Sequence, residues 1–170
     1  MSRQIQTSAL KSRVIEVALA HFSEVGIART NVGDILKDAN CSVGSLYHHF
    51  GNKEGIAEAL FIDGVNQFNA SLLAALLPRR TASTGISSIV TFCCDWVTDQ
   101  SQLAAYLLSR EIKLSESAKP ELQEMDRALS QSLFDWFVPH VESGTLQQLP
   151  MAMYVPCLLY TSDAADEEDS

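Results

Sequence analysis

The sequence has few cysteines and prolines, and it has no long apolar run. Its 170 residues include four cysteines, none of them in a CxxC pair, and five prolines. No apolar run approaches the ~20 residues of a membrane-spanning helix, and the charged N-terminus lacks the hydrophobic region of a signal peptide. These absences predict a cytoplasmic chain with reduced thiols and no membrane partner.

Motifs of the common enzyme classes are missing too. The sequence contains no nucleophile elbow, no HExxH motif, no phosphate-binding loop and no paired-acid motif. His48 and His49 are adjacent, but neighbouring residues of a helix point about 100° apart, and no cysteine or carboxylate lies at chelating spacing. We therefore predict no catalytic residue, no metal site and no cofactor.

Negative charge dominates the chain, but it is unevenly distributed. The formal net charge is −9, which by itself disfavours a nucleic-acid partner. Residues 1–56 contain six Lys or Arg and five Asp or Glu and so carry +1, whereas the remaining six basic and sixteen acidic residues carry −10. The N-terminal part therefore remains able to bind an anion.

The last segment, residues 157–170, differs from the sequence before it. An apolar stretch runs into the acidic string TSDAADEEDS without a turn signal. Residues 157–167 resemble the translated read-through of a transposon-end adapter used for sequencing libraries, and such segments are excluded from fold reasoning. We expect the native chain to continue beyond Pro156; a genuine disordered acidic tail is the alternative.

Apolar residues recur with helical spacing, and no stretch alternates as a strand does. Four helices are expected in the N-terminal part: one that stops at Gly26, one capped by Thr30 or Asn31 that ends at Asn40, one capped by Ser42 that ends near Phe50, and a long one from Asn52 toward Pro78. Next we expect a loop at 77–85, helices at 86–99 and 102–114, a long helix from Lys119-Pro120 that Pro139 kinks or ends before Gly144, and a helix from Pro150. The predicted class is all-α.

Two short helices around Asn40-Cys41-Ser42 form a helix-turn-helix candidate. A helix that enters the major groove needs small residues where it approaches DNA closely, and Gly44 and Ser45 are small. Leu46 and Phe50 lie four residues apart and can face the first two helices. The side chains expected on the open side are those of Ser42, Gly44, Ser45 and His48, with Val43 and Tyr47 as a neighbouring stripe.

Several polar groups near this motif suit phosphate binding. Tyr47 and His49 can reach phosphate oxygens without a full positive charge, although ordinary packing of the Tyr47 ring is a serious alternative. Lys53 lies at the start of the next helix, where backbone N–H groups and the helix dipole favour an anion. Thr30 and Asn31, at the start of the second helix, could bind phosphate in the same way.

The pattern T-x-V-x-D-I-x-x-x-A-x-x-S-x-G-S-L-Y-x-H-F-x-N-K-E, from Thr30 to Glu54, resembles the DNA-binding domain of the TetR/AcrR family. The resemblance covers about residues 8–60. It implies a helix-turn-helix DNA-binding domain at 1–54, joined through a long fourth helix to a helical effector-binding and dimerisation domain at 55–156. It further implies a homodimeric transcriptional regulator, usually a repressor, that binds double-stranded operator DNA and responds to a small-molecule effector.

The resemblance also implies roles for single residues. Carried over by position, the residues against base edges or backbone are Ser42, Gly44 and Ser45, and those on phosphates are Thr30, Tyr47, His49 and Lys53. Val43 stands where many members carry Lys or another polar residue, so contact with a thymine methyl would replace a polar contact. Since the final two helices of the family generally build the dimer interface, we expect a chain that stops near Pro156 to dimerise poorly.

Aromatic and apolar residues of the second part could line an effector pocket, because such pockets are largely apolar. The candidates are Phe68, Phe92, Trp96, Tyr106, Met125, Phe134 and Phe137. Their helical spacing fits an ordinary core equally well. The alternative function is a helical interaction or ligand-binding module that does not bind DNA, in which Gly44 and the aromatic residues serve packing alone.

Overall fold

The computed structural model describes residues 2–109 and 112–147, and within these ranges the chain is all-α, as predicted. The helices are α1 (Ser2–Val25), α2 (Val32–Asp38), α3 (Val43–Phe50), α4 (Lys53–Leu76), α5 (Ala82–Asp99), α6 (Ser101–Leu107) and α7 (Lys119–Glu142). No helix in the described ranges is long and apolar enough to cross a membrane. The predicted helix from Pro150 and the predicted tail lie outside these residues.

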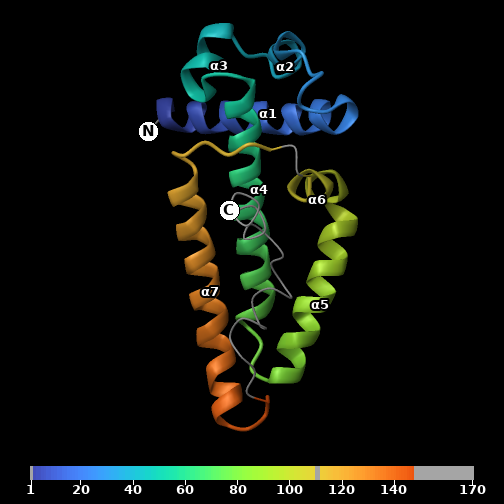
Figure 1. Ribbon diagram of the computed structural model, residues 1–170, viewed down its shortest axis with the longest axis vertical. Coiled ribbons are helices and arrows are strands. Elements are labelled where there is room, and N and C mark those ends of the chain that lie inside the picture. Colours follow the sequence, from blue (N-terminus) through green and yellow to red (C-terminus); the bar gives the residue numbers. More distant parts are fainter. Residues whose placement is uncertain (1, 110–111, 148–170) are drawn as a thin grey trace, which may run out of the picture.

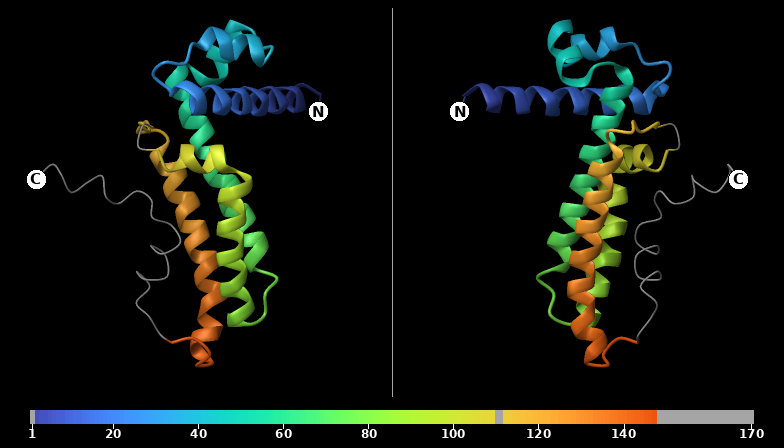
Figure 2. Two further views of the ribbon diagram at one scale, coloured as in Figure 1. Left: turned by 90° about the vertical axis from the view of Figure 1, so that its right-hand side faces the viewer. Right: turned by 60° about the vertical axis from the view of Figure 1, so that its left-hand side comes forward.

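Helix α4 is the axis of the molecule (Figure 1). Helix α1 lies across one end of it, and α2 and α3 lie on the outer side of α1. Helices α5 and α7 run lengthwise beside α4, and α6 lies next to α1 and α4 (Figures 1 and 2). This arrangement places α3 at one extreme of the molecule, away from α5 and α7.

Helices α2 to α5 begin where a side chain satisfies a free backbone N–H group. The Asn31 side chain accepts from the Gly33 N–H at 2.9 Å, the Ser42 hydroxyl from the Ser45 N–H at 3.2 Å, and the Asn52 side chain from the Gly55 N–H at 2.7 Å. All three caps confirm the predictions from sequence. Helix α5 begins at Ala82 instead of Ile86, so the predicted loop at 77–85 is too long. The reason is a further cap, because the Thr81 hydroxyl accepts from the Thr84 N–H at 3.3 Å.

Left-handed residues end the first two helices as predicted, since Gly26 has φ 79° and Asn40 has φ 47°. One other predicted end is wrong, because helix α6 stops at Leu107, well before the predicted end at 114. Helix α7 continues through Pro139 to Glu142, so Pro139 does not end it, and Gly144 closes its last turn with φ 72°, as predicted. Pro139 is exposed and lies in the last turn, so the backbone hydrogen bond that it removes affects only the end of the helix.

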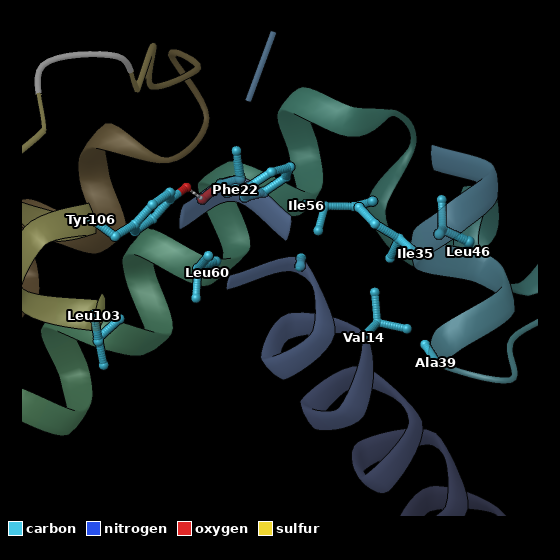
Figure 3. Close-up of a cluster of buried hydrophobic side chains, with 11 residues drawn as sticks. Val14, Phe22, Ile35, Ala39, Leu46, Ile56, Leu60, Leu103 and Tyr106 are labelled. Carbon is cyan, nitrogen blue, oxygen red and sulfur yellow. Dashed lines mark hydrogen bonds between the residues drawn. The ribbon is translucent and has the colours of Figure 1, made fainter. Parts of the chain in front are cut away.

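The first hydrophobic core joins α1, α2, α3, the N-terminal half of α4, and α6 (Figure 3). Its buried members are Val14, Ala18, Phe22, Ile35, Ala39, Leu46, Ile56, Ala57, Leu60, Leu103 and Tyr106. The Tyr106 ring stacks on Phe22 at 6.2 Å between centroids, and its hydroxyl donates to the Ala57 carbonyl at 2.8 Å. Burial raises the pKa of this phenol, so Tyr106 stays a hydrogen-bond donor. The helix-turn-helix and α6 therefore share one core.

The second hydrophobic core lies between α4, α5 and α7 and contains Leu72, Leu76, Ile89, Leu129, Leu133 and Trp136. The Trp136 indole N–H donates to the Arg79 carbonyl at 2.9 Å, which joins α7 to the loop after α4. Gly85 lies against the same indole ring, and a β-carbon added there would come within 2.1 Å of it. Close packing at this point therefore requires glycine in α5.

Candidate nucleic-acid interface

Helix α3 is held by one face and exposes the other. Leu46 is fully buried in the first core, and Phe50 packs against that core. On the stripe beside this buried one, Val43 and Tyr47 are 59% and 50% exposed, and neither belongs to a hydrophobic core. The outward residues are Ser42, Val43, Gly44, Tyr47 and His48, whereas Ser45 is half-buried, contrary to the predicted open position.

The turn before α3 fixes the direction in which this exposed face points. Asn40 adopts the left-handed conformation, and the Cys41 N–H donates to the Leu36 carbonyl at 2.9 Å. His21 on α1 and Asp38 on α2 lie 2.9 Å apart, Nε2 to Oδ2, and this contact connects α2 to α1. Helix α3 is thus a short element, anchored at its start by these contacts, whose outward residues Val43 and Tyr47 belong to neither core.

Packing within the folded chain does not require glycine at position 44. A β-carbon at this position would meet no atom within 4 Å, and Gly44 is not among the residues with positive φ. Glycine within a helix costs ~1 kcal/mol relative to alanine. The smallness of this residue on the exposed face is therefore unexplained by the folded chain alone.

Histidines supply the ionisable groups of α3. The rings of His48 and His49 lie 5.0 Å apart. Desolvation lowers the pKa of His49 below its ordinary value of 6.5, and the charges of His48 and Lys11 lower it further. Lys11, an exposed residue of α1, thus lies close enough to α3 to act on His49. The sequence analysis missed Lys11, whose only signal was its place in a mildly basic N-terminal part.

Two residues predicted to contact phosphates are engaged inside the protein. Thr30 is 5% exposed, and its hydroxyl donates to the Gly26 carbonyl at 2.8 Å. The Lys53 ammonium donates to the carbonyls of Ala28 at 2.8 Å and Thr30 at 3.1 Å. These bonds tie the start of α4 to the segment before α2, so Thr30 is buried and Lys53 has a structural contact, while their predicted phosphate contacts stay predictions. Asn31 stays exposed while its side-chain oxygen caps α2.

The seven candidates for an effector pocket do not converge. Phe68 contacts the rings of Phe92 and Trp96 at 5.4 and 4.9 Å between α4 and α5. Tyr106 belongs to the first core, so its assignment to the pocket is not supported. The other three lie on α7: Phe137 packs on Trp136, Met125 is half-buried and Phe134 is 39% exposed.

An open depression between α4 and α5 shares one residue, Phe92, with the predicted pocket. Its other lining residues are Ala75, Arg79, Ser83, Thr84, Ser87, Ser88, Thr91 and Asp95, so its wall is mostly hydroxylated. Among the described residues, no group of three His, Cys, Asp or Glu side chains is placed to hold a metal ion. The exposed face of α3 is therefore the candidate site with the clearest geometry.

Comparison with known proteins identifies this part of the chain. Residues 14–60 match the family of bacterial regulatory proteins called the tetR family. The match covers the helix-turn-helix part of the chain, which therefore resembles the DNA-binding part of that family. The matched segment runs from Val14 of α1 to Leu60 of α4 and includes all of α2 and α3. The N-terminal part of the chain thus has the helix-turn-helix arrangement, and its sequence matches regulatory proteins of this family.

Curated relatives extend the similarity beyond that domain. The chain is 28% identical over 134 residues to the negative transcriptional regulator IcaR of the biofilm operon icaADBC in Staphylococcus epidermidis, covering 76% of this chain and 70% of IcaR. It is 27% identical over 124 residues to the transcriptional regulator BetI of Cronobacter sakazakii, covering 73% of this chain and 61% of BetI.

A solved structure shares the whole architecture. The transcriptional regulator FadR of Bacillus subtilis, determined in complex with stearoyl-CoA, superposes with a TM-score of 0.71 at 19% identity. The superposition covers 86% of this chain and 80% of FadR, so the similarity in fold extends beyond the helix-turn-helix to the α4–α7 part.

Proposed function

We propose that this chain is a sequence-specific repressor that binds operator DNA through α3 and leaves it when a small apolar effector binds between α4, α5 and α7. The observation that carries the proposal is the exposed face of α3, which is held rigidly by buried Leu46 and presents Val43, Gly44 and Tyr47 outward. Such a helix can enter the major groove with its N-terminal residues toward base edges.

The proposed contacts divide into two sets. Ser42, Val43 and Gly44, at the start of α3, approach base edges and the floor of the groove. Phosphate contacts come from groups beside them, and we assign these to Asn31, Tyr47, His48, His49 and Lys11. Few full positive charges take part, so we expect a modest dependence of operator affinity on salt.

The proposed effector response follows from the two cores. An effector between α4, α5 and α7 would displace α5, and the short α6 follows α5 directly in the chain. Tyr106 and Leu103 connect α6 to the core of the helix-turn-helix, so a shift of α6 would be transmitted to α1 and α3. The second core and the Phe68–Phe92–Trp96 cluster are apolar, and FadR was crystallised with an acyl thioester, so we propose an apolar effector.

We further propose that the full-length protein is a homodimer. A dimer binds two half-sites whose centres lie ~34–36 Å apart, one turn of DNA. Effector binding would then act by changing the separation of the two α3 helices so that both no longer fit their half-sites. Sedimentation of the chain with and without a two-site duplex measures this assembly.

The test is selection of duplexes from a randomised library, followed by anisotropy titrations of the recovered duplex at several salt concentrations. We expect Tyr47→Ala to weaken binding to the selected duplex severalfold and Val90→Ala, an exposed substitution on α5, to leave it unchanged. Failure to recover any preferred duplex at low salt would instead favour the interaction module that does not bind DNA.

A further inference from the structure

The start of α3 combines two features that its own fold does not require. Val43 is a 59% exposed valine at the first position of the helix, outside both hydrophobic cores. Gly44, next to it, has open space where a β-carbon would lie. Val43 therefore offers a small apolar side chain to the outside, and Gly44 has no side chain that would keep another surface away from the backbone.

The composition of α3 limits which bases its side chains can recognise. The helix VGSLYHHF contains no Arg or Lys to pair with guanine in bidentate fashion, and no Asn or Gln to pair with adenine. Its outward groups are a valine, the Tyr47 ring and hydroxyl, and the His48 ring. The major-groove edge of thymine differs from the other bases in carrying a methyl group, and apolar side chains recognise that methyl.

We propose that Val43 determines operator specificity by packing its methyl groups against the 5-methyl group of a thymine, while Gly44 lets the backbone approach closely enough for this contact. The inference rests on the proposed function, because it presumes that α3 lies in the major groove. It goes beyond that function by naming the base, an A·T pair with its thymine under the first turn of α3 in each half-site.

A substitution that removes only the methyl group tests the contact. Each thymine of the selected duplex is replaced in turn by uracil, and the affinity of the whole chain is measured by anisotropy. We expect one thymine per half-site at which uracil weakens wild-type binding about fourfold, the loss expected for about one buried methyl group. Val43→Ala should bind the thymine duplex more weakly and lose most of its sensitivity to uracil at that position.

Three controls separate this contact from other effects. Val90→Ala removes an equally exposed valine (58%) from α5, so it should retain the full uracil effect. Val43→Thr keeps the shape of the side chain and loses one methyl, so it should fall between wild type and Val43→Ala. At the same position, 5-methylcytosine should bind better than cytosine to wild type and equally to Val43→Ala.

The outcomes distinguish failure of the thymine contact from failure of DNA binding itself. Equal uracil sensitivity in wild type and Val43→Ala, with both variants folded by circular dichroism, overturns the thymine contact and leaves DNA binding intact. A selected duplex without any uracil-sensitive thymine does the same. Recovery of no duplex at all refutes the proposed function first, and the valine would then belong to a protein-binding surface.

Discussion

Replacing Gly44 by alanine should move stability and operator affinity in opposite directions. The added β-carbon meets no atom of the folded chain within 4 Å, and the helical backbone suits alanine. Alanine is favoured over glycine inside a helix by about 0.5–1 kcal/mol. For a chain of this size we therefore expect the melting temperature to rise by about 1–4 °C.

The same β-carbon should weaken operator binding. If the α3 backbone approaches the groove at Gly44, the new methyl occupies space that DNA requires. Overpacking by a methyl group costs about 1–3 kcal/mol in well-packed cores, so a comparable loss here is at least about fivefold in Kd. Thermal unfolding by circular dichroism and anisotropy titration with the selected duplex measure the two effects on one sample.

A matched variant controls for helix propensity. Ser87→Ala, at an exposed position of α5 far from α3, should also stabilise slightly and should leave operator affinity unchanged. If Gly44→Ala binds the duplex as tightly as wild type, the backbone does not approach DNA at this point. If Gly44→Ala lowers the melting temperature, the description of open space around residue 44 is wrong.

Three further substitutions or conditions test other parts of the structure. Gly85→Ala should destabilise the chain by about 2–3 kcal/mol in urea unfolding, because the new β-carbon would overlap the Trp136 ring; an unchanged midpoint would contradict the packing described. Tyr106→Phe should cost about 1 kcal/mol through loss of the buried hydrogen bond to the Ala57 carbonyl, and no loss would mean that this bond contributes nothing net. Operator affinity should rise as the pH falls, since bound phosphates favour protonated His49, and the rise should continue below pH 6.5 because the pKa of His49 in the DNA-free protein is lowered. A His48→Gln/His49→Gln variant should flatten the profile, and an unchanged profile would remove both residues from the interface.

The N-terminal part was largely predictable because local chemistry decides its boundaries. The side chains of Asn31, Ser42 and Asn52 satisfy backbone N–H groups within three residues of themselves, so each helix start is encoded locally. Asn40 and Gly26 adopt left-handed conformations for equally local reasons. The motif that resembles the family contains most of these residues.

Contacts between distant segments could not be predicted in this way. The ammonium of Lys53 donates to carbonyls that lie more than twenty residues earlier, a contact that its place at a helix start does not reveal. The end of α6 was missed because the chain after it is held elsewhere, with the Ser115 N–H donating to the Glu58 carboxylate at 2.5 Å. The start of α5 is different, because Thr81 is a local signal that could have been found.

The pocket prediction shows a further limit of helical periodicity. Spacing identifies which residues face inward, but it does not say which core they join. Tyr106 and Phe92 both lie on apolar faces, yet Tyr106 stacks on Phe22 of α1 in the first core while Phe92 contacts Phe68 of α4 beside the second core. Assignment to a core or a pocket depends on the crossing of α6 with α1, which no local pattern contains.

The shared core has a consequence for how such regulators are recombined. A chimera that joins residues 1–54 of this chain to the body of another regulator would keep Phe22 and lose Tyr106 and Leu103, which close the core from α6. The exchangeable unit is therefore discontinuous: it consists of α1–α3, the first turns of α4, and the inward face of α6. An effective graft of this protein's DNA specificity onto another scaffold would have to carry the α6 residues with it, or else change only the outward residues of α3.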